Sequence, residues 1–279
     1  MVRKPAVAGM FYPGSKTDLS KMLDLLFKSV DKSKIDTAEI KKASGFVAPH
    51  AGYEYSGYVA AYTYSALLEY AADKHVDTFV IVGPNHMGYA DFVTVSLEDW
   101  ETPLGIAKND TEFSKEVSVY DKRFSTSESE IAEEHSIEVQ VPFIQHLFQQ
   151  PKFAFICMSD QGAGASKAVC DAVLSASKKL GRRIAFIASS DFDHYEPASV
   201  AEQKDMPAIH ALESLDEALF RKLLADADDT ACGYGPISAA VLFAKSNGAK
   251  KGLLLKYGNS GYSTGDFSSV VAYASIAML

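Results

Sequence analysis

The chain has 279 residues, of which 47% are hydrophobic and 23% charged, as in globular proteins with a sizeable core. Its net charge of -9 argues against a nucleic-acid partner, because a phosphate backbone is bound by surfaces rich in Lys and Arg. No apolar run is long enough to span a bilayer, and Pro5 and Gly9 interrupt the short apolar stretch near the N-terminus. We therefore expect a cytoplasmic protein that acts on a small molecule, without a nucleic acid or a membrane as its partner.

The three cysteines are far apart in the chain and form no Cys-x-x-Cys pair. This usage suits a reducing compartment and excludes a zinc site built from paired cysteines. Cys157 lies in an apolar strand-like run and Cys170 in a helical stretch, so we interpret both as core thiols. Cys232 differs, because it lies just before the N-terminus of an expected helix, whose dipole favours the thiolate.

Two strand-like runs, 45–53 and 78–86, carry His50 and His86 near their ends. The helical segment 56–70 between them predicts a βαβ unit with parallel strands. Ligands of open α/β sheets bind beyond the carboxyl ends of the strands, which is where both histidines fall. Two imidazoles at neighbouring strand ends could share a metal ion, although a lone histidine after a strand is most often an ordinary loop residue.

The remaining pattern continues the alternation of helices and strands. Short apolar runs bounded by turn residues predict strands at 91–97, 153–158, 183–188, 251–257 and 268–278. Apolar residues at helical spacing predict helices at 19–30, 208–227 and 237–245. A further helix is expected to open near Glu133, with Pro142 at a kink or at its true start, and with His135 as a cap or as a partner of a metal ligand. Without a linker or a composition break, one domain over residues 1–279 is expected.

A third histidine, His194, follows the run 183–188 and has Asp191 and Asp193 beside it. An aspartate next to a histidine can fix its tautomer and raise its basicity, as a general base or a metal ligand requires. Cys232 likewise lies at the end of an element, where loops positioned by a rigid sheet carry function.

Six motifs, in the same order and almost from end to end of the chain, resemble the Memo family. They are Pro5-Ala-Val-Ala-Gly9 with Phe11-Tyr-Pro13, Ala48-Pro49-His50-Ala-Gly52-Tyr53, Gly83-Pro84-Asn85-His86, Glu134-His135-Ser136-Ile137-Glu138, Ser189-Ser190-Asp191-Phe192 with His194, and Cys232-Gly233 with Pro236. The resemblance implies a single αβα sandwich around a central mixed sheet, related to the class III extradiol ring-cleaving dioxygenases, with a pocket at the strand ends.

The resemblance also implies which residues form the site. His50, His86 and Cys232 would hold a metal ion, with Fe(II) as our first expectation and copper as the second, while His194 would move protons. We further expect Asp191 to orient His194. In the dioxygenases two His and one Glu hold Fe(II). A thiolate at the third position keeps the negative charge but is softer, suits Cu(I) and can itself be oxidised.

The leading hypothesis is therefore a mononuclear metalloprotein with oxidoreductase chemistry of the dioxygenase type. Its substrate would be a small molecule, with aromatic molecules among the candidates, and the sequence does not specify which one. A second hypothesis is a metal-free thiol enzyme that uses Cys232 as a nucleophile on an ester or amide. A third is a non-catalytic module that binds phosphotyrosine peptides in the same pocket. It ranks last because no Arg occurs within the pocket motifs.

Overall fold

Four parallel strands form the centre of the sheet in the computed structural model, which describes residues 2–72 and 74–279. Their order across the sheet is β8 (Lys152–Met158), β3 (Thr78–Pro84), β9 (Ile184–Ser189) and β2 (Gly45–Ala48). Each pair is in register over several residues, so the carboxyl ends of the four strands lie along one edge. This edge is where an open α/β sheet binds its ligands.

Further strands extend this centre on both sides, and the antiparallel pairs among them make the sheet mixed. Next to β2 lies β12 (Val270–Met278), which pairs antiparallel with β2, with β11 (Gly252–Asn259) and with the short β10 (His194–Glu196). The strands at the other side are β6 (Gly105–Asn109), β5 (Asp99–Thr102), β1 (Val2–Arg3), β4 (Val93–Val95) and β7 (Phe124–Ser125).

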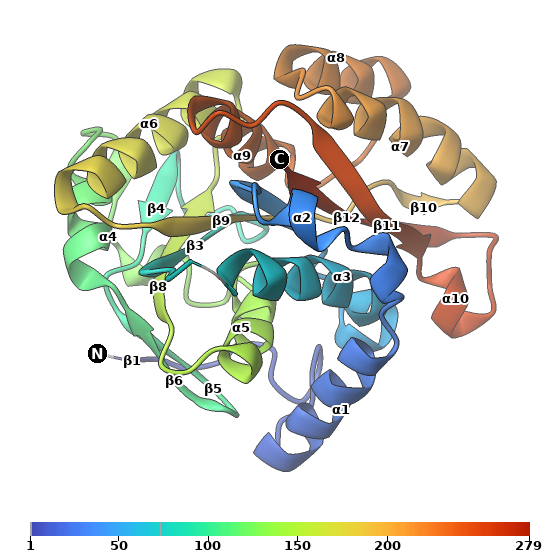
Figure 1. The fold of residues 1–279 in the computed structure, drawn as a ribbon, viewed down its shortest axis with the longest axis horizontal. Coiled ribbons are helices and arrows are strands. Elements are labelled where there is room, and N and C mark those ends of the chain that lie inside the picture. Colours follow the sequence, from blue (N-terminus) through green and yellow to red (C-terminus); the bar gives the residue numbers. More distant parts are fainter. Residues whose placement is uncertain (1, 73) are drawn as a thin grey trace.

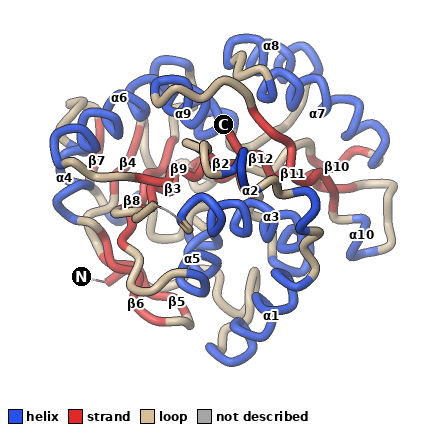
Figure 2. The backbone as a smooth tube through the Cα atoms, viewed as in Figure 1, coloured by secondary structure: helices blue, strands red, loops and turns tan. Residues whose placement is uncertain are grey.

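Helices cover both faces of the sheet, as Figures 1 and 2 show. One face carries α4 (Thr111–Ser118), α6 (Ala163–Leu180), α7 (Ala198–Glu213), α8 (Glu217–Ala227) and α9 (Tyr234–Ser246). The other carries α1 (Lys16–Lys28), α2 (Thr37–Ile40), α3 (Tyr53–Ala71) and α5 (Val141–Leu147). Shorter pieces are α10 (Gly261–Thr264) and the 3₁₀ turns at Lys32–Lys34, Glu128–Glu130 and Glu138–Gln140.

The alternation of side chains along β3 shows why the sheet needs both helical layers. Phe79 and Ile81 enter the core beneath α3 and α5, whereas Val80 and Val82 enter the core beneath α6 and α9. A strand that is buried on both faces is apolar at every position, which explains the uninterrupted hydrophobic run in the sequence. The structure thus confirms the predicted α/β class, with αβα layers around a mixed sheet in one compact domain.

Three predicted elements differ from the structure. The helix expected at 208–227 is two helices, because Leu215 has a left-handed backbone (φ 52°) and Asp216 accepts a hydrogen bond from Leu219 N–H to begin α8. The helix expected from Glu133 begins only at Val141. Pro142 occupies its first turn, where a missing N–H is tolerated, so Pro142 marks the true start of the helix. The strand expected at 91–97 is limited to β4.

Both core thiols were predicted correctly, since Cys157 and Cys170 are buried. Among the described residues, no helix has the length and apolar character needed to cross a membrane.

Candidate metal centre

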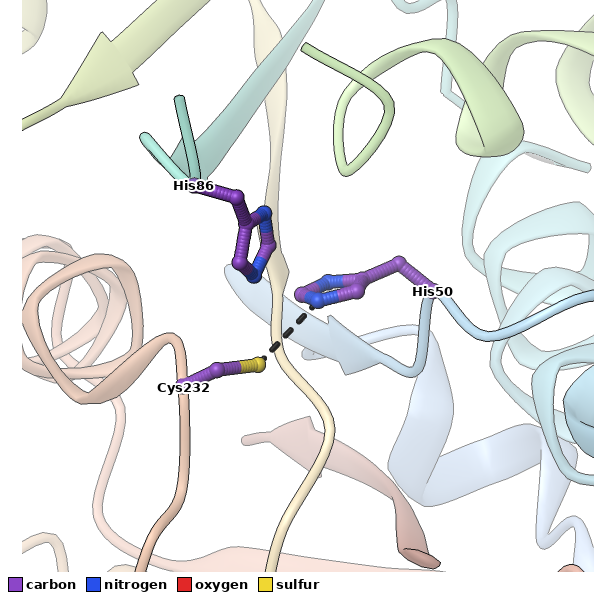
Figure 3. A group of neighbouring side chains, drawn as sticks. All are labelled: His50, His86 and Cys232. Atoms are coloured by element: carbon purple, nitrogen blue, oxygen red, sulfur yellow. Dashed lines mark hydrogen bonds between the residues drawn. The ribbon is translucent and has the colours of Figure 1, made fainter. Parts of the chain in front are cut away.

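Three potential ligands converge at the carboxyl edge of the sheet (Figure 3). His50 follows the end of β2, His86 follows the end of β3, and Cys232 lies in the loop that leads into α9. One ligand atom from each residue lies within 4.8 Å of the other two. This spacing allows a single metal ion to contact two imidazole nitrogens and one sulfur.

Hydrogen bonding fixes the tautomer of His50. The Ser189 hydroxyl donates its only proton to the carbonyl oxygen of Ser136 (2.7 Å) and accepts one from the Gln140 amide (2.8 Å). It must therefore also accept from Nδ1–H of His50, 2.9 Å away. Burial lowers the pKa of His50 well below its usual value, so Nε2 carries a free lone pair at neutral pH. This lone pair faces Cys232.

Glu134 orients His86 in the same way. One carboxylate oxygen of Glu134 lies 2.9 Å from Nδ1 of His86, and the other accepts the backbone N–H of His86 (2.6 Å). A carboxylate can only accept, so Nδ1 carries the proton and Nε2 is left for a ligand. Burial alone would lower the pKa of His86, but the hydrogen bond and charge of Glu134 outweigh it and raise this pKa. His86 in turn holds the pKa of buried Glu134 at about 2.

The sulfur of Cys232 lies 3.1 Å from Nε2 of His50 and accepts the backbone N–H of Asp191 (3.3 Å). Burial, reinforced by the nearby charge of Asp191, raises the pKa of this thiol well above its usual value. The prediction that the dipole of α9 favours a thiolate is therefore wrong for this structure, because lost hydration outweighs it. Without a cation, the neutral thiol of Cys232 donates a hydrogen bond to Nε2 of His50. A metal ion in the place of this proton would stabilise the thiolate.

Asp191 holds the turn after β2. Its Oδ1 atom accepts hydrogen bonds from the backbone N–H groups of His50 (2.7 Å) and Ala51 (3.3 Å), which fixes the turn that carries His50. Burial raises the pKa of Asp191 to about 7, although both hydrogen bonds act to lower it. Among the described residues, Asp191 makes no hydrogen bond to His194, and its expected role in orienting His194 stays a prediction.

His194 is instead held by Thr230. The Thr230 hydroxyl accepts the backbone N–H of His194 (2.8 Å), donates to Asp193 (3.0 Å) and lies 3.5 Å from Nδ1 of His194. Burial lowers the pKa of His194, so its imidazole is neutral at neutral pH. His194 is the first residue of β10, and it lines the same pocket as His50 and His86.

Glu134 was not recognised as a site residue from the sequence, whereas His135 was expected as a helix cap or as a partner of a metal ligand. His135 does not cap α5. It stacks on His86, with ring centroids 4.6 Å apart, and contacts Phe11 on another side. Glu134, His135 and His86 form a second group of potential ligand atoms. The oxygens of Glu134 are less available to a metal ion, because they already accept hydrogen bonds from His86 and Ser136. The motif Glu134-His135-Ser136 was the sequence feature that could have identified Glu134 as a site residue. The residues around the motif did not indicate that it folds back over the strand ends.

A pocket of about 540 Å³ opens beside these residues. Among the described residues, its lining includes no Lys or Arg and is rich in imidazole and aromatic rings: Phe11, His50, Tyr55, His86, His135, His194, Tyr195 and Tyr273. Such a lining suits a small planar molecule better than an anion.

The layers and the strand-end cluster define an αβα protein with a potential mononuclear metal site of two imidazoles and one thiol. Comparisons with known proteins place almost the whole chain in one family. The family model for Memo-like proteins matches residues 3–277, and the chain belongs to this family.

Relatives from archaea are similar over their full lengths. A MEMO1 family protein of Methanosarcina barkeri is 40% identical over 278 residues, which cover 99% of each chain. A MEMO1 family protein of Methanopyrus kandleri is 38% identical over 286 residues, with 99% of this chain and 98% of the relative covered. One of Methanocaldococcus jannaschii is 39% identical over 280 residues, covering 98% of both.

Proposed function

We propose that this chain is a mononuclear metalloprotein that holds Fe(II) or copper through His50, His86 and Cys232, and that it acts as an oxidoreductase on a small aromatic molecule. The observation that carries the proposal is the orientation of the two imidazoles. Both Nδ1 atoms are engaged by neighbouring side chains, Ser189 and Glu134, and this leaves both Nε2 atoms available near the sulfur.

The donor set fits a metal of borderline or soft character. Two neutral nitrogens and one thiolate would together give a single negative charge, enough to bind Fe(II) with open positions or Cu(I) with few further ligands. The 3.1 Å contact between the sulfur and Nε2 of His50 supports this, because a metal ion could replace the thiol proton that lies between these two atoms. A bound Fe(II) or copper ion would supply one-electron chemistry and a contact point for the substrate.

The other residues of the pocket would bind and position the substrate. His194 has Nδ1 turned toward Thr230, so Nε2 of its neutral imidazole is the atom that would accept a proton from a phenol. Asp191 keeps His50 in place through the backbone of the turn. The ring of His135, stacked on His86, would exclude water from one side of the ligand position.

The test is anaerobic metal analysis of the purified protein after separate loading with Fe(II) and with copper. We expect one metal ion per chain in the wild type and a loss of at least tenfold in affinity in Cys232→Ser and His86→Ala. His75→Ala is the matched control, because His75 is exposed and lies outside the pocket. Absence of metal from the wild type with both ions would contradict the proposal.

A second function is supported by one observation, the 3.1 Å contact between Cys232 and His50, which resembles a nucleophile and its base. Such a thiol hydrolase would need a thiolate and an imidazolium side by side. Burial opposes both charges, since it raises the pKa of Cys232 and lowers that of His50. Hydrolysis of an ester that survives chelators and stops on stoichiometric alkylation of Cys232 would favour this function over the metalloprotein.

A further inference from the structure

Tyr195 has an unusual backbone at the mouth of the pocket. Its φ is 66°, in the left-handed region that L residues other than Gly, Asn and Asp rarely adopt. It is the extra residue of a β-bulge, because His194 pairs with Val271 and Glu196 pairs with Val270 of the facing strand. The left-handed position of such a bulge is normally taken by glycine. A tyrosine there is unfavourable for the fold.

Nothing in the packing of Tyr195 offsets this strain. The side chain is 78% exposed, more than that of any other large hydrophobic residue among the described part of the chain. Its phenol oxygen makes no hydrogen bond to another described residue, while its backbone carbonyl accepts one from Ser269 (3.3 Å). Burial therefore contributes little to retaining a tyrosine, and a strained residue without a structural reason is a candidate for function.

The position of Tyr195 supplies the missing reason. It lines the pocket beside the metal centre, and its ring centroid is 5.8 Å from that of His194. Tyr55 and Met10, also on the pocket lining, are 41% and 73% exposed. Three large side chains are thus exposed around one opening, and a ligand entering there would cover them.

We propose that Tyr195 is a ligand-binding residue, whose ring stacks on a planar, uncharged aromatic ligand held between it and the histidines of the pocket. This inference rests on the proposed function only in placing the ligand beside the metal centre. In this proposal the β-bulge places the ring of Tyr195 at the mouth of the pocket, and the left-handed backbone of Tyr195 is the cost of that placement. An aromatic contact formed on binding contributes on the order of a tenfold gain in affinity.

Catechol is the probe, titrated by calorimetry into the metal-free protein and, without oxygen, into the Fe(II)-loaded protein. We expect Tyr195→Gly to weaken catechol binding about tenfold and Tyr195→Phe, which keeps the ring, to change it less than twofold. The melting temperature of Tyr195→Gly should equal or exceed that of the wild type, because glycine adopts the left-handed backbone without a Cβ. Metal affinity should be unchanged.

The matched control is Gln150→Gly. Gln150 is exposed and also left-handed (φ 50°), but it lies outside this pocket, so its replacement should leave catechol binding unchanged. The inference is overturned by unchanged catechol affinity in Tyr195→Gly, by an equal loss in Tyr195→Phe, by a lower melting temperature of Tyr195→Gly, or by a wild type that binds no catechol. Failure of the chain to bind metal would contradict the proposed function alone, because the metal-free titration still tests Tyr195.

Discussion

The sulfur of Cys232 lies 3.1 Å from Nε2 of His50, although 182 positions separate the two residues in the chain. His50 follows the short strand β2, whereas Cys232 enters from the loop before α9 on the face covered by α6 and α9. The contact thus joins a strand end to a helix start across the sheet edge. The residues around this pair can be replaced one at a time, so the contribution of each to metal affinity can be measured.

Replacing Glu134 by Gln tests the orientation of His86. The amide can donate a hydrogen bond to Nδ1 and so move the ring proton to Nε2, the atom that faces the ligand position. We expect metal affinity to fall by about 10- to 100-fold. Competition with a chromophoric chelator measures this loss. Glu133→Gln, an exposed neighbour, is the control, and an equal loss in both variants would contradict a specific role for Glu134.

Gly233 allows the loop with Cys232 to approach β9. A Cβ at this position would lie 2.3 Å from the carbonyl oxygen of Ser189 and 2.6 Å from Cβ of Ser190. Gly233→Ala should therefore displace the thiol, reduce metal affinity at least tenfold and destabilise the fold by about 1–3 kcal/mol. Gly164→Ala, where a Cβ meets nothing within 4 Å, should leave both unchanged or slightly raise stability. Metal titration and urea unfolding of the two variants decide the point.

The buried ion pair of Arg3 and Glu138 should be important for stability. The two side chains are 4% and 1% exposed, with Nη1 and Oε2 2.7 Å apart. Glu138→Gln leaves the guanidinium buried without its counter-charge, which costs roughly 3–5 kcal/mol. Glu101→Gln breaks the neighbouring pair with Lys4, which is largely exposed, and should cost about 0–1 kcal/mol. Similar urea midpoints for the two variants would show that burial of the pair is unimportant.

Asp205 predicts a pH dependence of stability. Its carboxyl is buried next to Asp229 and accepts hydrogen bonds from Tyr257 (2.6 Å) and from the backbone of Asp193 (3.1 Å). Burial first, and then the charge of Asp229, raise the pKa of Asp205 well above its usual value. The folded state therefore keeps a proton that the unfolded chain has lost, and stability falls as pH rises above the ordinary pKa of an aspartate toward the raised pKa of the folded state.

Asp205→Asn should reduce this loss, because an amide is neutral at every pH and can replace the protonated acid. The urea midpoint of the wild type should be lower at pH 8 than at pH 5, with a smaller difference in the variant. Asp226→Asn, an exposed change on α8, should keep the wild-type difference. A difference that is identical in all three proteins would show that Asp205 does not control it.

Much of the fold could be predicted because burial on both faces leaves a clear pattern. Residues 79–82 and 153–158, which form most of β3 and β8, are all apolar, and the helical spacing of the apolar residues in α1 and α9 was equally clear. The break between α7 and α8 was missed, since the buried Leu215 continues the apolar pattern while its backbone turns left-handed. Side-chain periodicity does not report backbone handedness at one residue.

The site was predictable only in part, and for a related reason. His50 and His86 follow strands that are parallel neighbours of β9, so their meeting could be expected from topology. The roles of Asp191 and Glu134 could not, because both act through hydrogen bonds to residues far away in the chain. Which partner a buried carboxylate accepts from depends on loop paths that local sequence does not encode.

The anchoring of the first residues by Glu138 has a consequence for the order of assembly. Glu138 accepts hydrogen bonds from Arg3, from the backbone of Ala6 and Val7, and from Tyr12, which fixes the segment that presents Phe11 to the pocket. During synthesis this segment emerges before its acceptor, which follows more than a hundred residues later, and before Cys232, which follows later still. A nascent chain without Cys232 would lack one of the three proposed ligands, so we expect metal to bind only after most of the sheet has been synthesised.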